Sequence, residues 1–266
     1  MCIKINIKDK QMRKISVLGS ITFSMLVSCA ATGQEMPVGA LVDTVDCTLN
    51  DGVTMAQAVE WARNLPREGM QPNTEFYREN ILGSSNYKAD YDFQIGSYFD
   101  SYSQLVATVA SNLALPANRT RPGQRATDLY TCDTGTQRIV ENRAVPNGGT
   151  FTGPVTLMST FLCRINDDST PADVWEFLVG VNDNYRAEGE TSIVQLQTRA
   201  VGPVQNRGNG DFVGIAVVPS TPEAWGARMD MPRDGFSPFE GVELPMICNY
   251  PSLWLTHAVH RSGPPQ

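Results

Sequence analysis

The residues with the clearest chemical potential in this chain are its cysteines. Cys47 and Cys132 are 85 residues apart, and Cys163 and Cys248 have the same spacing. Equal spacing of this kind is typical of disulfides in an exported protein. Four cysteines allow three pairings, and the spacing alone does not choose among them. The alternative is that all four are unpaired, buried thiols.

The chain has only two histidines, His257 and His260, which are three residues apart near its C-terminus. On one helical turn both could reach a haem iron or a metal ion, but on a strand they would point to opposite faces. Because no run of cysteines or carboxylates accompanies them, we expect neither a metal site nor a resident cofactor.

Aromatic residues complete the set of candidate ligand-contacting side chains. Trp61 and Phe177 occupy matching positions in two similar segments, and Trp254 lies just before the histidines. Core packing is the simpler interpretation of such aromatics, and ligand contact is the alternative. The candidate set is Trp61, Phe177, Trp254, His257 and His260.

These matched positions belong to an internal repeat. The segments 47–61 and 163–177 are identical at six of fifteen positions at an offset of 116, and the same offset relates Cys132 to Cys248. Both segments contain a threonine, Thr54 or Thr170, that can cap a helix with an apolar stripe. Apolar, partly alternating runs on either side predict strands.

Each copy therefore shows the order βαββαβ, which is the ferredoxin-like arrangement. In this topology the first and last strands are antiparallel neighbours. That adjacency favours the pairs Cys47–Cys132 and Cys163–Cys248 over the two pairings between copies. The predicted fold class is α+β, with tandem duplicated ferredoxin-like repeats that form a pseudo-dimeric α/β-barrel.

The N-terminal segment is typical of a bacterial export signal. Arg13 and Lys14 precede an apolar run at 15–27, which is too short to span a bilayer. The run ends in a sequence that resembles the lipobox, so Cys29 is the predicted lipidation site. Ala30 follows it, which favours the outer membrane, with the protein facing the periplasm. The alternative is an ordinary secretory signal, which would leave a soluble periplasmic protein.

The predicted segments follow from the repeat and the signal. They are a lipoprotein-type signal peptide at 1–28, a tether at 29–39, a first repeat at 40–146, a linker at 147–153, a second repeat at 154–260 and a tail at 261–266. Removal of 1–28 changes the formal net charge from −7 to −11. Such an acidic body excludes nucleic-acid binding and disfavours anionic lipid surfaces, so the lipid would provide the attachment.

Two ferredoxin-like units in one chain resemble a fused dimeric α/β-barrel. The residues that carry the resemblance are the strand–helix units at 47–61 and 163–177, the strand at 92–98, and the strands at Cys132 and Cys248. They also resemble uncharacterised exported two-repeat proteins of marine bacteria. The resemblance implies two sheets packed face to face with the helices outside.

Catalytic signatures are absent from the sequence, including the nucleophile elbow, phosphate-binding loop, dinucleotide fingerprint and Cys-x-x-Cys pair. We therefore predict a non-catalytic binding module for a small apolar ligand or an envelope protein. The alternative is a cofactor-independent monooxygenase-like enzyme that acts on a small organic substrate in the barrel, and a third hypothesis is haem handling. A barrel filled by side chains favours the first hypothesis, and a deep pocket with convergent polar groups favours the second.

Overall fold

The computed structural model describes residues 36–67, 69–83, 90–114, 125–146, 148–202, 211–239 and 242–262. The predicted signal peptide, Cys29, most of the tether, the first linker residue and most of the tail lie outside the described residues. The helices described are all too short or too polar to cross a membrane.

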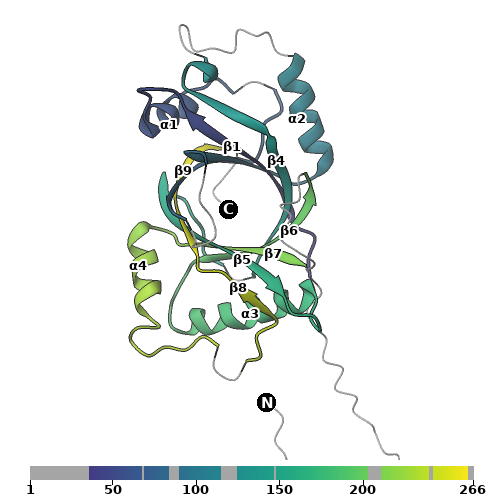
Figure 1. The fold of residues 1–266 in the computed structure, drawn as a ribbon, viewed down its shortest axis with the longest axis vertical. Helices are drawn as coiled ribbons and strands as arrows, with labels where there is room; N and C mark the ends of the chain where they lie inside the picture. The colour runs from purple at the N-terminus through teal and green to yellow at the C-terminus, as the bar shows by residue number, and fades with distance from the viewer. Residues whose placement is uncertain are drawn as a thin grey trace, which may run out of the picture. The chain divides into compact units, whose positions relative to one another are not determined.

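Eight antiparallel strands close into a barrel, which Figure 1 views from its end. The order around the barrel is β7-β6-β4-β1-β3-β2-β9-β5, and β5 pairs with β7 to complete the circle. The strands are β1 (Ala40–Leu49), β2 (Thr74–Leu82), β3 (Phe93–Phe99), β4 (Tyr130–Ala144), β5 (Val155–Ile165), β6 (Ile193–Val201), β7 (Phe212–Val218) and β9 (Ser252–Arg261). The structure thus confirms an α+β fold, with one closed barrel in place of two separate facing sheets.

A short ninth strand, β8 (Met246–Cys248), shares one place around the barrel with β9. Both pair with β5, at Cys163 and Cys248 for β8 and at Thr160 and Ser252 for β9. The sequence predicts one final strand here, and the structure interrupts it just before Ser252. Pro251 lies in the break, and proline lacks the N–H group that a strand interior needs.

The helices lie outside the barrel, with α1 and α2 on one side of the ring and α3 and α4 on the opposite side (Figure 1). They are α1 (Met55–Arg63), α2 (Tyr102–Ala114), α3 (Pro171–Ala187) and α4 (Pro222–Asp230). Capping boxes start α1 at Thr54 and α3 at Thr170, as the sequence predicts. Hydrophobic clusters lie beneath α1 and α3, against the outer wall of the barrel.

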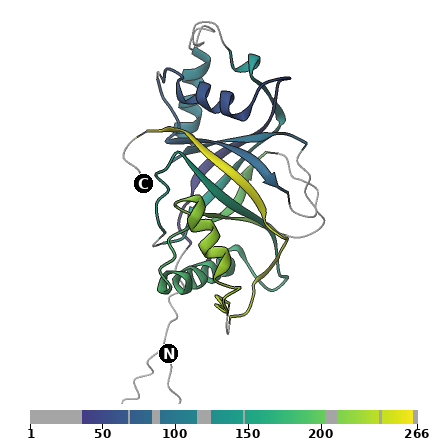
Figure 2. The ribbon, with the colours of Figure 1, turned by 90° about the vertical axis from the view of Figure 1, so that its left-hand side faces the viewer.

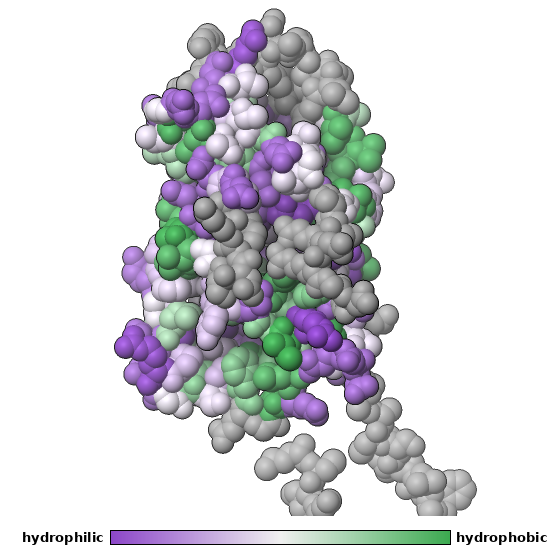
Figure 3. Space-filling model, in the orientation of Figure 1, coloured by the Kyte–Doolittle hydropathy of each residue, from purple (hydrophilic) through white to green (hydrophobic). Residues whose placement is uncertain are grey.

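Helix α2 differs because part of its hydrophobic surface faces solvent. Tyr102, Val106 and Val109 are exposed, and green side chains gather at the position of α2 on the right of Figure 3. The described residues do not show what would cover this surface.

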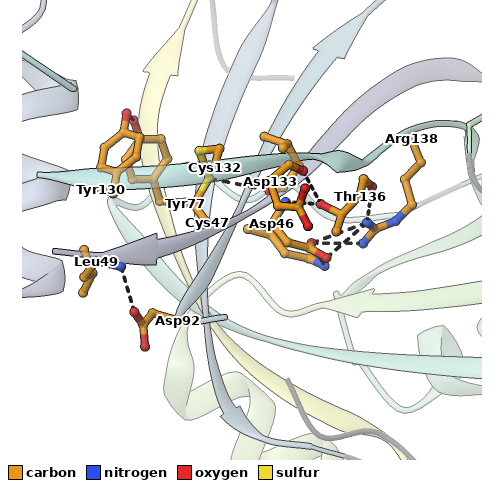
Figure 4. The surroundings of a disulfide bond; sticks show 12 residues. Asp46, Cys47, Leu49, Tyr77, Asp92, Tyr130, Cys132, Asp133, Thr136 and Arg138 are labelled. Carbon is orange, nitrogen blue, oxygen red and sulfur yellow. Dashed lines mark hydrogen bonds and ion pairs between the residues drawn. A yellow bond between two sulfur atoms is a disulfide. The ribbon is translucent and has the colours of Figure 1, made fainter. Parts of the chain in front are cut away.

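Two disulfides tie neighbouring strands together. Cys47 of β1 is bonded to Cys132 of β4, and Cys163 of β5 to Cys248 of β8. These are the pairs that strand adjacency favours in the sequence, and Figure 4 shows the first of them. Disulfides are compatible with an exported protein, because they persist in oxidising compartments.

Two ladders join the strand group β1–β4 to the group β5–β9. One is β4 with β6, and the other is β2 with β9, whose register runs from Thr74 opposite Arg261 to Leu82 opposite Leu253. In Figure 2, β9 is the yellow strand that crosses the barrel wall diagonally. We call these two ladders the seams of the barrel.

Candidate active site

The barrel interior holds a cavity of about 360 Å³ that is partly open to solvent. Successive side chains of a strand point to opposite faces, so alternate residues of each strand reach the interior. Polar side chains from five strands meet there: Thr44, Arg78, Gln94, Arg138, Gln197 and Arg199. Apolar and aromatic side chains, including Met158 and Trp254, line the same cavity.

Arg78 of β2 is the most unusual of these polar residues. It is 5% exposed, and its Nη2 donates a 2.7 Å hydrogen bond to the Tyr98 hydroxyl. Its Nε is buried without a hydrogen-bond partner. Among the ion pairs formed by the described residues, none includes Arg78. A buried guanidinium without a counter-charge is costly, and that cost falls when an anion binds beside it.

Gly96 of β3 makes room for the Arg78 guanidinium. A Cβ atom built on Gly96 would lie 3.0 Å from Arg78 Cζ and 3.1 Å from its Nη1. A Cβ atom at this position would therefore require the guanidinium to shift by a few tenths of an ångström.

Arg138 of β4, in contrast, already has a carboxylate partner. Its Nη1 lies 3.4 Å from Asp46 Oδ1, and Gln94 Nε2 donates to the same oxygen at 2.9 Å. Burial raises the pKa of Asp46, and the Arg138 charge and the Gln94 hydrogen bond oppose that shift. Figure 4 shows Asp46 between the disulfide and Arg138. Asp46 does not line the cavity itself, but it contacts Arg138 and Gln94, which do, and so it fixes their positions.

The ladder between β1 and β4 is irregular next to Asp46. Thr44 lies opposite Arg138 and Asp46 opposite Asp133, so the extra residues of this bulge belong to β4. The Asp46 backbone N–H donates to Thr136 Oγ1 at 3.1 Å instead of to the β4 backbone. Asp46 and Cys47 are successive residues of β1, so their side chains point to opposite faces, the carboxylate toward the interior and the disulfide toward α1.

Trp254 of β9 supplies a flat apolar wall to the cavity. It is 4% exposed, and its Nε1 donates a 2.7 Å hydrogen bond to Thr160 Oγ1. The Tyr91 ring stacks against it, with 6.5 Å between centroids. The hydrogen bond to Thr160 and the stacked Tyr91 ring fix the orientation of the indole, so it can orient a planar ligand.

Of the five candidate ligand-contacting residues, only Trp254 lines this cavity. Trp61 is buried under α1 with its ring edge-on to Tyr130, and Phe177 of α3 stacks on Phe239. His257 faces α1, where it lies beside Arg63 in a second, shallower pocket. The structure therefore does not bring the five residues together.

The two histidines do not fit a haem site in the cavity. His257 Nε2 lies 3.7 Å from Glu79 Oε2 on the outer wall, and burial lowers the pKa of both His257 and His260. The described cavity lining contains no histidine or cysteine. Among the described residues, no three histidine, cysteine or carboxylate side chains cluster as metal ligands would.

Sequence reasoning missed Arg78, Gln94 and Asp46. A signal was available for β1, where Thr44 and Asp46 alternate with apolar residues inside a strand that also carries a buried disulfide. The alternation indicates that one face of β1 is polar, but it does not indicate that this face lines a cavity.

The chain was compared with families, sequences and solved structures. No protein-family model matches it. No curated protein sequence matches it either. Similar solved structures include a monooxygenase-like protein from Fusobacterium nucleatum (TM-score 0.45, 9% identity, 87% of this chain and 99% of that chain). Others are an anthrone oxidase-like protein (0.41, 12%, 85% and 95%) and a haem-binding protein from Thermus thermophilus (0.42, 11%, 84% and 92%).

The functional prediction made from the sequence, a non-catalytic binding module, is corrected on the cavity itself. The similar structures are named for oxidation or haem binding. Their identities and TM-scores are too low to transfer any residue's role. The cavity supplies the argument within this chain, because it has the convergent polar groups by which the sequence analysis distinguishes the enzyme alternative.

Proposed function

We propose that this chain is an enzyme that oxidises a small organic substrate with molecular oxygen inside its barrel, without a bound cofactor. The supporting observation is the cavity inside the barrel, where Trp254 lines the same space as the guanidinium groups of Arg78 and Arg138. Few polar residues are needed for such a reaction, which is consistent with the absence of catalytic motifs from the sequence.

The reaction requires a substrate with an activated C–H group next to a carbonyl or phenol. Transfer of a proton to solvent gives an enolate or phenolate, which donates electrons to O₂, and solvent returns the proton to the reduced oxygen that leaves as water. Overall, R₂CH₂ and O₂ give R₂C=O and H₂O, so one oxygen atom enters the product and the other becomes water. The donors in the cavity stabilise the negative charge of the ionised substrate, and the barrel wall restricts access of water. Trp254 holds the planar part of the substrate in place.

Anthrone is a suitable probe because its acidic methylene is oxidised by O₂ to anthraquinone and water. Protein treated with a chelator and free of flavin and haem absorbance should consume O₂ with anthrone faster than buffer does. Mass spectrometry should find one ¹⁸O atom from ¹⁸O₂ in the anthraquinone. Consumption at the buffer rate, or activity that returns only with added metal, would contradict the proposal.

Two tryptophans provide a matched pair of variants for this assay. Trp254 donates to Thr160 inside the barrel, and Trp225 of α4 donates to Ser159 at 2.9 Å on the outer face of the same strand. Trp254→Leu should lower the anthrone rate by about tenfold, because it removes the wall that positions the ring. Trp225→Leu should keep the rate. Equal effects of the two substitutions would mean that the reaction does not take place in the barrel.

We also propose that the protein is anchored by lipid at Cys29 in the outer membrane and faces the periplasm. The lipobox-like end of the apolar segment supports this proposal, and the two disulfides are compatible with it. Globomycin, which blocks cleavage of lipoprotein signals, should make the precursor accumulate in the producing cells. Unchanged processing would favour an ordinary secretory signal.

A tandem duplication, as in the exported two-repeat proteins that the sequence resembles, is part of the same proposal. Around the barrel, the order β4-β1-β3-β2 is followed by β9-β5-β7-β6. In both groups the first strand lies between the last strand and the third strand. A disulfide joins β1 to β4 in the first group and β5 to β8, which shares the place of β9, in the second. These recurrences support an origin from two copies of one ferredoxin-like unit.

A further inference from the structure

We propose that the cavity selects an organic monoanion and binds its carboxylate or oxyanion through Arg78. The inference rests on the proposed function only in treating this anion as the substrate. The binding of an anion can be tested apart from any reaction.

The balance of charges along the cavity supports a single negative charge on the ligand. Arg138 is neutralised by Asp46, and Arg199 and Asp211 are exposed and of opposite sign. Arg78 is left as a buried cation that no carboxylate of the described chain neutralises. One further negative charge inside the barrel would compensate it.

The donor geometry of Arg78 supports the same ligand class. A guanidinium has five N–H donors, and a carboxylate can accept two of them at once. Tyr98 accepts one, and the Nε donor has no partner although it is buried. A buried donor that lacks a partner is rare in folded proteins, so the Arg78 guanidinium is incompletely satisfied within the described chain.

The apolar part of the cavity restricts the type of anion that can bind at Arg78. Trp254 and Met158 are 4% and 3% exposed, and both line the same cavity as Arg78. A compact inorganic anion would leave these apolar surfaces without contacts. An aromatic carboxylate or phenolate would instead place its charge at Arg78 and its ring on the apolar side.

Benzoate and benzamide separate charge from shape, because they share a ring and differ in the charged group. Isothermal titration calorimetry of the full chain should show that benzoate binds at least tenfold more tightly than benzamide. Arg78→Gln should weaken benzoate binding by about 10- to 100-fold and leave benzamide binding unchanged. Arg78→Lys should fall between these two, because it keeps the charge but loses the fork of donors.

Arg164→Gln is the control for the loss of one positive charge. Arg164 lies on β5, but its side chain is 53% exposed and pairs with Asp167 on the surface. This variant should bind benzoate as the unmodified chain does. Equal affinities for benzoate and benzamide, or unchanged benzoate binding by Arg78→Gln, would overturn the inference.

Gly96→Ala is the second variant, in case Arg78→Gln does not fold. The added methyl group would crowd the guanidinium from 3.0 Å without removing any charge. It should weaken benzoate binding and leave benzamide binding unchanged. Unchanged affinity for both probes would count against Arg78 as the anion-binding group.

The two proposals fail in different ways. Benzoate binding that depends on Arg78, together with no oxidation of anthrone, would support the anion site and contradict the oxygenase. Oxidation of anthrone by the unmodified chain, together with equal binding of benzoate and benzamide, would support the oxygenase and overturn the anion site.

Discussion

Removal of the disulfide Cys47–Cys132 should lower the free energy of unfolding by about 4.5 kcal/mol. The two residues are 85 positions apart, and the chain-entropy relation for a closed loop of that length gives about 4.5 kcal/mol at 25 °C. Alanine is the suitable replacement, because Cys47 is 1% exposed and a serine hydroxyl there would be buried.

The second disulfide, Cys163–Cys248, has the same separation and should contribute about as much. Its loop lies wholly after the first one in the sequence, so each bond restricts a different part of the unfolded chain. The two losses should therefore add to about 9 kcal/mol. Most domains have a total stability of about 5–15 kcal/mol, so a chain without either bond should be marginally stable or unfolded.

Urea unfolding followed by circular dichroism can measure these losses. The proteins needed are the unmodified chain, the two alanine pairs and the variant with all four cysteines replaced. Reduction of the unmodified chain should reproduce the fourfold variant. Losses below about 1 kcal/mol per bond, or a combined loss that departs from additivity by more than about 2 kcal/mol, would refute the reasoning from separate loops.

Two further predictions concern charged groups outside the cavity. Arg228 lies 3.7 Å over the Tyr185 ring and pairs with buried Glu190, so Arg228→Ala should cost about 3–5 kcal/mol in urea unfolding, and removal of both charges should cost less. An equal cost for the single and double variants would contradict this. Burial lowers the pKa of His257 from 6.5, so the unfolded chain takes up a proton more readily than the folded chain as the pH falls below about 6.5. The melting temperature should therefore fall between pH 7.5 and 5.5, and less steeply for His257→Gln; identical slopes would contradict the assignment.

The features that could be predicted from the sequence depend on local patterns. The capping boxes at Thr54 and Thr170 require residues only three positions apart, and they occur as expected. The equal cysteine spacing left three pairings open, and the topology, in which the first and last strands are neighbours, favoured the pairs that occur. Local structure and topology agree here, which is the condition under which sequence reasoning works.

The cavity could not be predicted in the same way. Arg78 and Asp46 lie on strands that are 32 residues apart in sequence, and their relation depends on the register of β1, β3 and β2. A shift of one residue in any ladder would turn a side chain to the opposite face. The bulge in β4 opposite Thr44 and Asp46 and the break before Ser252 change the register locally, and no composition or periodicity signal reports them.

The seams have a consequence for how the chain folds. Most ladders join strands that are close in sequence, but the seam of β2 with β9 pairs Thr74 with Arg261. Contacts of such long range form slowly, because a large loop must close before they contribute. Until then, β2 and β4 each present an open edge, and an open edge can pair with another chain. At high concentration, the competing product should be a dimer in which one chain supplies β6 and β9 to the open strands of its neighbour.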